Sequence, residues 1–233
     1  MARPRPFSRF RYWLSYLWEQ SLEVTSSDYN AYLEVCLVHG RLQLVAEDAI
    51  YSFGDYYLNF RKIFEVFDFD RLPERASVLV LGLGLGSIPE LLERHLGLSY
   101  TYVAVEIDPV IIELASEYSL PELESPLEVV EADALAFLQA DHRRYDLICV
   151  DVFQDATVPG HLDGAGFVGL LQESLRPGGA LIYNRLASSI PDRTAARSYY
   201  EEIFAPAFSA PYLYDTGGNY LLVNDRQFLT LPA

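Results

Sequence analysis

The stretch Val78–Ser87, which reads VLVLGLGLGS, constrains the fold of this chain more than any other feature. The apolar, β-branched run at 77–81 is typical of a parallel strand that is covered on both faces. Ser87 and, three residues later, Glu90 match a capping-box pattern and predict that a helix begins here. Glycine permits a sharp turn and a close approach to a ligand because it has no Cβ. Three glycines separate the predicted strand from the predicted helix: Gly82, Gly84 and Gly86.

Glu106 ends the next apolar run, 102–105, twenty residues after the last of these glycines. A carboxylate in this place can accept hydrogen bonds from the hydroxyls of a ribose. The dinucleotide pattern G-x-G-x-x-G would put its third glycine at position 87, whereas this chain has G-x-G-x-G. That spacing favours one nucleoside over the turn rather than a pyrophosphate at the helix N-terminus. We therefore predict an adenosyl cofactor with a sulfonium, and NAD is the weaker alternative.

From residue 77 onward, strand-like and helix-like segments alternate. This pattern predicts an α/β fold with a doubly wound, mostly parallel, Rossmann-like sheet of seven strands. A hairpin around the turn 217–219 adds one antiparallel strand near the end of the chain. The predicted strands before that hairpin are 77–81, 101–106, 127–130, 145–151 and 180–185, with a turn at 177–179 before the last. The predicted helices are 88–96, 109–118, 133–140, 164–175 and 194–204.

The chain before this sheet divides into two parts. Residues 21–54 alternate like strands and predict a small β-hairpin domain, followed by the cofactor-binding domain at 55–233. Residues 1–20 form a basic, aromatic arm or a short helix whose apolar part is too short to span a bilayer. Two hairpins and an aromatic helix bury little by themselves, so we expect them to pack on the main domain or on a second subunit of a homodimer.

Composition narrows the classes of ligand. The net charge of −16 repels phosphate backbones, which argues against a nucleic-acid partner. It would attract a cationic small molecule, although it could equally serve only solubility. Cys36 and Cys149 lie in apolar runs and read as buried thiols of a reducing compartment, which predicts a cytoplasmic protein. The four histidines show no metal-ligand spacing, so no metal is implied.

Together these features resemble the class I S-adenosylmethionine-dependent methyltransferase fold, and more closely its spermidine synthase (polyamine aminopropyltransferase) branch. The motif E-I-D is matched at 106–108, and E-A-D-A at 131–134 matches the segment that contacts adenine. The resemblance implies that Glu106 and Ile107 bind the ribose side of the cofactor and that Asp133 and Ala134 bind its adenine. It places Asp151, which ends the fourth strand, at the reaction centre.

The sequence also departs from this family's pattern. Leu85 replaces the aspartate of the glycine loop G-G-G-D-G-G, and 52–55 reads S-F-G-D where the family has S-Y-Q-E. The D-x-x-D loop is approximated by Asp151 and Asp155, one residue further apart. The nucleoside-binding half is thus retained, and the amine-recognising half is largely lost.

Three hypotheses follow from this combination. The leading one is methyl transfer from S-adenosylmethionine to an unknown small acceptor. In this hypothesis, the protein has no aspartate near the donor's tail, because Leu85 takes its place. S-adenosylmethionine is then expected to bind at least as tightly as its decarboxylated form. The alternative is an aminopropyltransferase that uses decarboxylated S-adenosylmethionine and holds a cationic acceptor with Asp55, Asp151 and Asp155. The third is a non-catalytic nucleoside-binding protein. Asp151 would orient the donor or act as a general base, and Tyr183 is a further candidate to face the acceptor.

Overall fold

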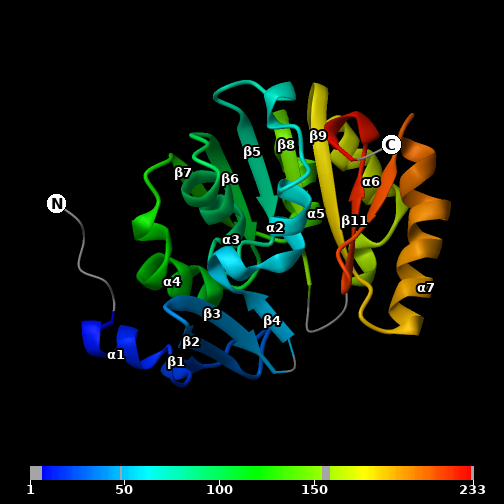
Figure 1. Ribbon diagram of the computed structural model, residues 1–233. Coiled ribbons are helices and arrows are strands. Elements are labelled where there is room, and N and C mark those ends of the chain that lie inside the picture. Colours follow the sequence, from blue (N-terminus) through cyan, green and yellow to red (C-terminus); the bar gives the residue numbers. More distant parts are fainter. Residues whose placement is uncertain (1–6, 48, 154–157, 232–233) are drawn as a thin grey trace.

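The computed structural model describes residues 7–47, 49–153 and 158–231, which form two sheets stacked end to end (Figure 1). The short helix α1 (Arg9–Leu14) precedes an antiparallel sheet with the strand order β1-β2-β3-β4. The two predicted hairpins are the antiparallel pairs β2/β3 and β3/β4, and β1 pairs with β2 to extend this N-terminal sheet. Its strands are β1 (Gln20–Thr25), β2 (Leu33–Val38), β3 (Arg41–Ala46) and β4 (Ala49–Ser52).

The larger sheet has seven strands in the order β10-β11-β9-β8-β5-β6-β7. The pairs β9/β11 and β11/β10 are antiparallel and the others are parallel, which confirms the predicted fold class. The strands are β5 (Ser77–Leu81), β6 (Thr101–Glu106), β7 (Leu127–Glu131), β8 (Tyr145–Val150), β9 (Leu175–Leu186), β10 (Tyr212–Asp215) and β11 (Asn219–Val223).

Each face of this sheet has its own apolar core, and strand β5 supplies both of them. Val78 and Val80 pack in the first core, while Leu79 and Leu81 pack in the second, and all four side chains are fully buried. Burying one such side chain stabilises the fold by about 1.5–3 kcal/mol, which explains the uninterrupted apolar run. The N-terminal sheet packs in the first core as well.

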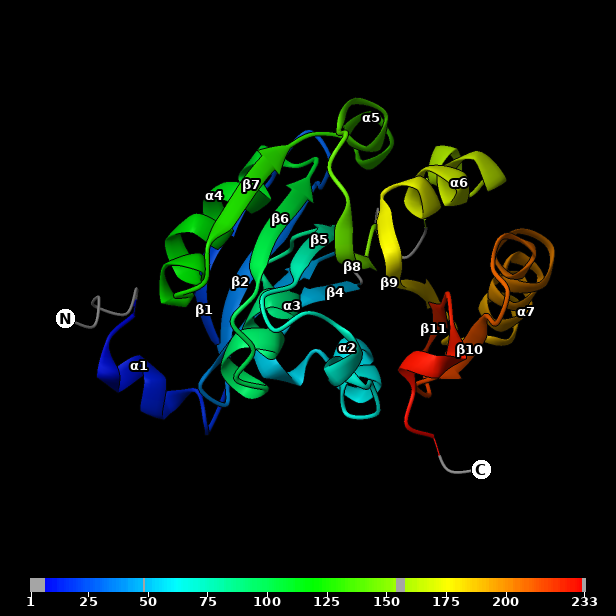
Figure 2. The ribbon, with the colours of Figure 1, turned by 90° about the horizontal axis from the view of Figure 1, so that it is seen from above.

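Helices cover both faces of the large sheet, as seen from above (Figure 2). The first core contains side chains of α2, α3 and α4, and the second contains side chains of α5, α6 and α7. Among the described residues no helix has both the length and the apolar character needed to cross a membrane. The bounds are α2 (Leu58–Phe64), α3 (Ser87–Glu90), α4 (Pro109–Tyr118), α5 (Ala134–Ala140), α6 (Ala165–Glu173) and α7 (Ile190–Tyr199).

Three local predictions were wrong. Gly86, at φ 79°, is the N-cap of α3, and Ser87 does not cap it, because its hydroxyl bonds with that of Ser52 at 2.5 Å. The turn expected at 177–179 is an irregularity inside β9, where the register with β8 shifts. Helix α7 begins four residues earlier than predicted because Ser189 and Asp192 form a capping box.

Candidate functional site

The carboxyl ends of β5, β6, β7 and β8 face the N-terminal sheet (Figure 1). A cavity of about 510 Å³ is lined by residues at these strand ends and by residues of the N-terminal part of the chain. Parallel strands place their carboxyl ends at one edge of a sheet, which is where open α/β sheets bind ligands. Seven of the residues predicted to bind cofactor line this cavity: Gly82, Gly84, Glu106, Ile107, Asp133, Ala134 and Asp151.

Other predicted site residues lie elsewhere. Gly86 is absent from the cavity lining. Asp55 forms an ion pair with Arg41 outside the cavity. The fully buried Tyr183 donates its hydroxyl to the carbonyl of Leu162 at 3.1 Å, in the core of the opposite face. Asp155 lies outside the described residues.

Leu85 also lies away from the cavity. Its side chain is 3 % exposed and packs in the first core. A leucine in the core neither attracts nor repels the tail of a donor, so Leu85 does not influence which donor is bound.

The glycine turn brings two strand ends into direct contact. Gly82 has φ 91°, and a Cβ built on it would lie 2.2 Å from the carbonyl oxygen of Asp151. Gly84 has φ 53° and packs against the main chain of Tyr51 on β4. The turn therefore needs glycine for its backbone conformation and for the close approach of β8 and β4.

Glu106 sits beside this turn and accepts four backbone N–H groups. One oxygen accepts from Leu83 at 3.1 Å and Gly84 at 3.4 Å, and the other accepts from Ile107 at 2.9 Å and Asp108 at 3.2 Å. Burial raises the pKa of Glu106, and these four donors oppose that shift. The carboxylate is thus held rigidly between the turn and the cavity.

Asp151 is a buried carboxylate of the cavity whose pKa lies well above its ordinary value. Burial raises its pKa to about 6, hydrogen bonds from Asn184 and Tyr57 oppose this shift, and the charge of Glu106 adds to it. The amide of Asn184 donates to Asp151 at 2.8 Å. A carboxylate with this pKa is ionised at neutral pH and can still take up a proton, as a general base must.

Asp133 caps helix α5 and also faces the cavity. Its Oδ1 accepts from the N–H of Ala136 at 3.0 Å, and its Oδ2 lies 2.7 Å from Nε2 of His161. Burial tends to raise the pKa of Asp133, but the bonds from His161 and Ala136 outweigh it and lower the pKa. The helix-capping role is observed, while adenine binding stays a prediction.

Sequence reasoning missed the wall that the N-terminal sheet contributes. Tyr29, Asn30, Ile50 and Tyr51 line the cavity from that side. Asn30 donates to the buried Asp108 at 2.7 Å and accepts from Tyr51 at 2.9 Å. Asp108 belongs to the E-I-D motif, but its hydrogen bond to Asn30, far away in the sequence, is seen only in the folded structure. Further missed residues of the lining are Tyr57, Asn59, Phe153, His161 and Asn219.

The charge of the cavity is one-sided. Four carboxylates line it, those of Glu106, Asp108, Asp133 and Asp151, and its described lining contains no lysine or arginine. A cation is favoured in such a field, whereas a ligand carboxylate would find no lysine or arginine partner among the described lining residues.

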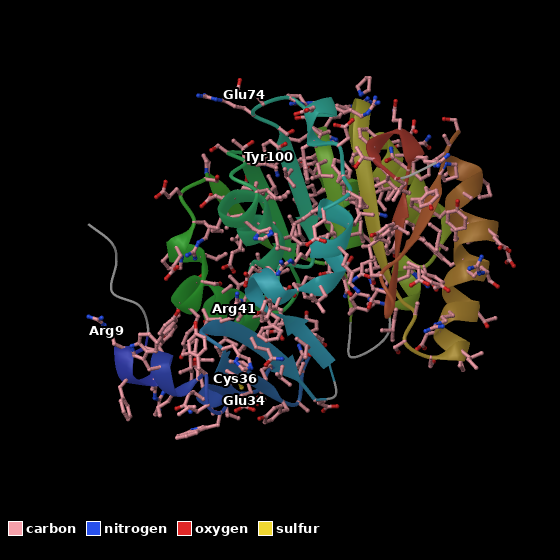
Figure 3. The ribbon with its side chains drawn as sticks, in the orientation of Figure 1. Arg9, Glu34, Cys36, Arg41, Glu74 and Tyr100 are labelled. Carbon is pink, nitrogen blue, oxygen red and sulfur yellow. The ribbon has the colours of Figure 1, made fainter. Side chains whose placement is uncertain are left out.

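A second group of ligand-type atoms lies on the N-terminal sheet, where Figure 3 labels Glu34 and Cys36 side by side. The side-chain ligand atoms of Glu19, Glu34 and Cys36 lie within 4.8 Å of one another. Burial, followed by a hydrogen bond with Glu19, raises the pKa of the Cys36 thiol. A bound metal would itself deprotonate a coordinating thiol, so this shift does not decide whether the group binds one, and the absence of a metal stays a prediction.

Comparisons with curated proteins point to two kinds of transferase. The chain is 36% identical over 108 residues to a probable polyamine aminopropyl transferase of Bifidobacterium longum, covering 46% of this chain and 24% of that protein. It is 28% identical over 158 residues to a polyamine aminopropyltransferase of Vibrio vulnificus, covering 66% and 51%. It is also 36% identical over 115 residues to an N-terminal histidine N-methyltransferase of Emericella nidulans, covering 47% and 20%. The chain spans about half or less of the length of these relatives, and no family model matches it.

Solved structures support the same fold. A spermidine synthase from Thermotoga maritima superimposes with a TM-score of 0.66 at 17% identity, covering 88% of this chain and 72% of that one. Human methyltransferase-like protein 13, in complex with SAH, superimposes with a TM-score of 0.53 at 24% identity, covering 65% and 72%.

Proposed function

Because the chain is a spermidine synthase-like protein with the class I methyltransferase fold, we propose that it transfers an alkyl group from an adenosyl sulfonium donor to an amine. Glu106 would bind the ribose. The ribose hydroxyls would donate hydrogen bonds to its carboxylate in place of backbone N–H groups of the loop. Asp133 would accept from the adenine amino group, and Gly82 and Gly84 would let the donor lie against the turn. The size and lining of the cavity support this assignment.

Among such donors, decarboxylated S-adenosylmethionine fits the cavity better, which makes aminopropyl transfer our first proposal. The observation that carries it is the charge of the lining, with four carboxylates and no lysine or arginine in its described part. The decarboxylated donor has an ammonium tail and no carboxylate. S-adenosylmethionine would have to place its carboxylate in a negative field without a cationic partner. This reverses the order of affinities that Leu85 suggested.

The bound sulfonium would supply an already activated carbon, so the chain mainly has to position the nucleophile and remove its proton. Asp151, ionised above a pKa of about 6, would accept a proton from the acceptor ammonium. Tyr57 and Asn184 would hold that carboxylate in place. The tyrosines and amides of the N-terminal sheet would form the acceptor side of the cavity.

Methyl transfer from S-adenosylmethionine is the second candidate. The similarity to an N-terminal histidine N-methyltransferase favours it, as does the replacement of the family's polyamine-framing residues by Phe53 and Gly54. Both enzyme candidates use the same carboxylates and differ in the donor's tail and in the acceptor.

Thermal-shift titration with both donors, methylthioadenosine and NAD, followed by product analysis with putrescine, tests these proposals. We expect decarboxylated S-adenosylmethionine to raise the melting temperature at the lowest concentration, because a ligand stabilises according to its dissociation constant. Tighter binding of S-adenosylmethionine with formation of a methylated product would replace aminopropyl transfer by methyl transfer. If no adenosyl compound raised the melting temperature, the proposed transferase function would be wrong.

We further propose that the protein is a cytoplasmic homodimer that associates through α1 and the N-terminal sheet. Trp13, Leu17 and Trp18 expose 66 %, 75 % and 58 % of their surface. Neighbouring large apolar side chains that are this exposed are typical of an association surface. The two cysteines are buried and unpaired, as in a reducing compartment.

A further inference from the structure

Two buried asparagines connect the C-terminal hairpin to Asp151. The amide nitrogen of Asn184, on β9, donates to Oδ1 of Asp151 at 2.8 Å. The amide nitrogen of Asn219, at the start of β11, donates to Oδ1 of Asn184 at 2.9 Å. Asn184 is fully buried and Asn219 is 9 % exposed.

The turn before β11 holds Asn219 in place. Its N–H donates to the hydroxyl of Thr216 at 3.1 Å, and its carbonyl accepts from both the N–H and the hydroxyl of Thr216. Lys62, on α2, donates to the carbonyl of Thr216 and so ties this turn to the face of the sheet that α2 covers. Asn219 is therefore fixed by contacts that are independent of Asp151.

The chemistry of the amide group makes this chain directional. An ionised carboxylate only accepts hydrogen bonds, so Asn184 must turn its NH2 group toward Asp151. Its carbonyl oxygen then faces Asn219, which must present an NH2 group in turn. If Asn219 could not donate, Asn184 could turn its own NH2 group toward position 219 and leave a carbonyl oxygen against Asp151, which would suit only the protonated acid.

We propose that Asn219 and Asn184 form a two-amide relay that positions Asp151 and holds it in its ionised, proton-accepting form. Asn184 makes the contact, and Asn219 acts through it as a positioning residue. The proposal rests on the role assigned to Asp151 in the proposed function, but its effect on Asp151 exists in the resting protein as well.

Other groups that face Asp151 also influence whether it is protonated, and one of them acts in the same direction as the relay. Burial and the charge of Glu106 on β6 favour the protonated acid, and the hydroxyl of Tyr57, which precedes α2, favours the ionised one. Cys149 lies two residues earlier on β8, where burial and then the charge of Asp151 raise its pKa, so it remains a neutral thiol. Asn184 and Tyr57 are therefore the two donors that oppose burial at this carboxylate.

The test measures the titration of Asp151 directly, by carbon-13 NMR of labelled aspartate carboxyls in the full chain, with the signal assigned from Asp151→Asn. Asn219→Asp keeps the shape of the side chain, and its ionised form offers no donor to Asn184. We expect it to raise the titration midpoint of Asp151 by about one unit. Asn224→Asp is the matched control, because it adds the same charge just after β11 at a side chain that bonds only to the backbone of Leu181 and Gly179. It should leave the midpoint near that of the unaltered protein.

Asn184→Leu separates the relay from the charge that Asn219→Asp introduces. Through-space repulsion acts whether or not Asn184 is present, whereas the relay needs it. We therefore expect Asn219→Asp to raise the midpoint by less than half as much in the Asn184→Leu background as it does alone, a coupling of the kind that double-mutant cycles detect. Near-UV circular dichroism would check folding, and Asn184→Ala would replace Asn184→Leu if the latter did not fold.

Equal shifts in both backgrounds, or no shift with Asn219→Asp, would overturn the relay. In the active enzyme, the same shift should appear in the acidic limb of the pH profile of kcat/KM. If no transfer reaction were found, the proposed function would fail while the NMR titration still decided the relay.

Discussion

Replacing Gly82 by alanine should damage the fold more than the same change at Gly97, although both glycines have left-handed φ values of 91° and 72°. An L-residue in that conformation costs about 1–2 kcal/mol, and both variants carry this cost. A Cβ at Gly97 meets nothing within 4 Å, so Gly97→Ala should lose only that amount. A Cβ at Gly82 would lie 2.2 Å from the carbonyl oxygen and 2.7 Å from the carbonyl carbon of Asp151.

Such an overlap with backbone cannot be relieved by rotating a side chain, so the end of β8 must move. Overpacking of a core costs about 1–3 kcal/mol, which brings the expected loss for Gly82→Ala to about 2–5 kcal/mol. Urea unfolding of both variants measures the difference in their free energies of unfolding, provided that the slope of free energy against urea concentration is the same for both. Gly82→Ala should also lose affinity for adenosyl donors because Asp151 moves, whereas Gly97→Ala should keep it. Equal losses of stability in the two variants would refute the claim that the turn is shaped by contact with β8.

Two further predictions concern the cofactor and the assembly. Glu106→Ala should weaken binding of adenosyl donors by about 1–3 kcal/mol, the scale of a hydrogen bond to a charged group. Glu131→Ala, at the exposed end of the paired strand β7, should leave the donor affinity measured by calorimetry unchanged. If the two variants lost the same affinity, Glu106 would not belong to the site. Light scattering at micromolar concentration should give the mass of a dimer. The double variant Trp13→Ser, Leu17→Ser should dissociate into monomers at lower dilution than the unaltered protein. A monomer for the unaltered chain would mean that this apolar surface has another use.

The sequence was most informative where local pattern and tertiary environment agree. The run 77–81 is apolar because both faces of β5 are buried, so its pattern predicted its position in the sheet. The acidic residues at strand ends lie close together because parallel strands bring their carboxyl ends to one edge, while their roles toward a ligand stay predictions. Glu106, Asp133 and Asp151 accordingly line one cavity.

Prediction failed where the outcome depends on which neighbour a side chain meets. Ser87 has the spacing of a cap, but Ser52 from the N-terminal sheet bonds to it instead. Leu85 stands in the motif position of a ligand-binding aspartate, yet a leucine gains more from the core than from a polar cavity. Asn219 has no local signal at all, because its role depends on a hairpin folding back beside β9.

The four carboxylates of the cavity differ in how far their charge is already compensated, and this difference predicts how donor binding depends on pH. Asp108 accepts from Ser27, Asn30 and the N–H of Val110, Asp133 is paired with His161, and Glu106 accepts four N–H groups. Asp151 has a pKa raised to about 6, so its charge is present above that pH and lost below it.

An ammonium tail held by Asp151 should therefore bind more weakly on acidification. Two charges about 4 Å apart at an effective dielectric constant of 20 attract by about 4 kcal/mol, and solvent screening and desolvation leave a part of that as net affinity. We expect decarboxylated S-adenosylmethionine to lose about tenfold in affinity between pH 7.5 and pH 5, a change of about 1.4 kcal/mol. Methylthioadenosine, which has no charged tail, serves as the control for general effects of pH on the adenosine side. Parallel losses for both compounds would show that the pH dependence does not come from Asp151 meeting the donor's ammonium.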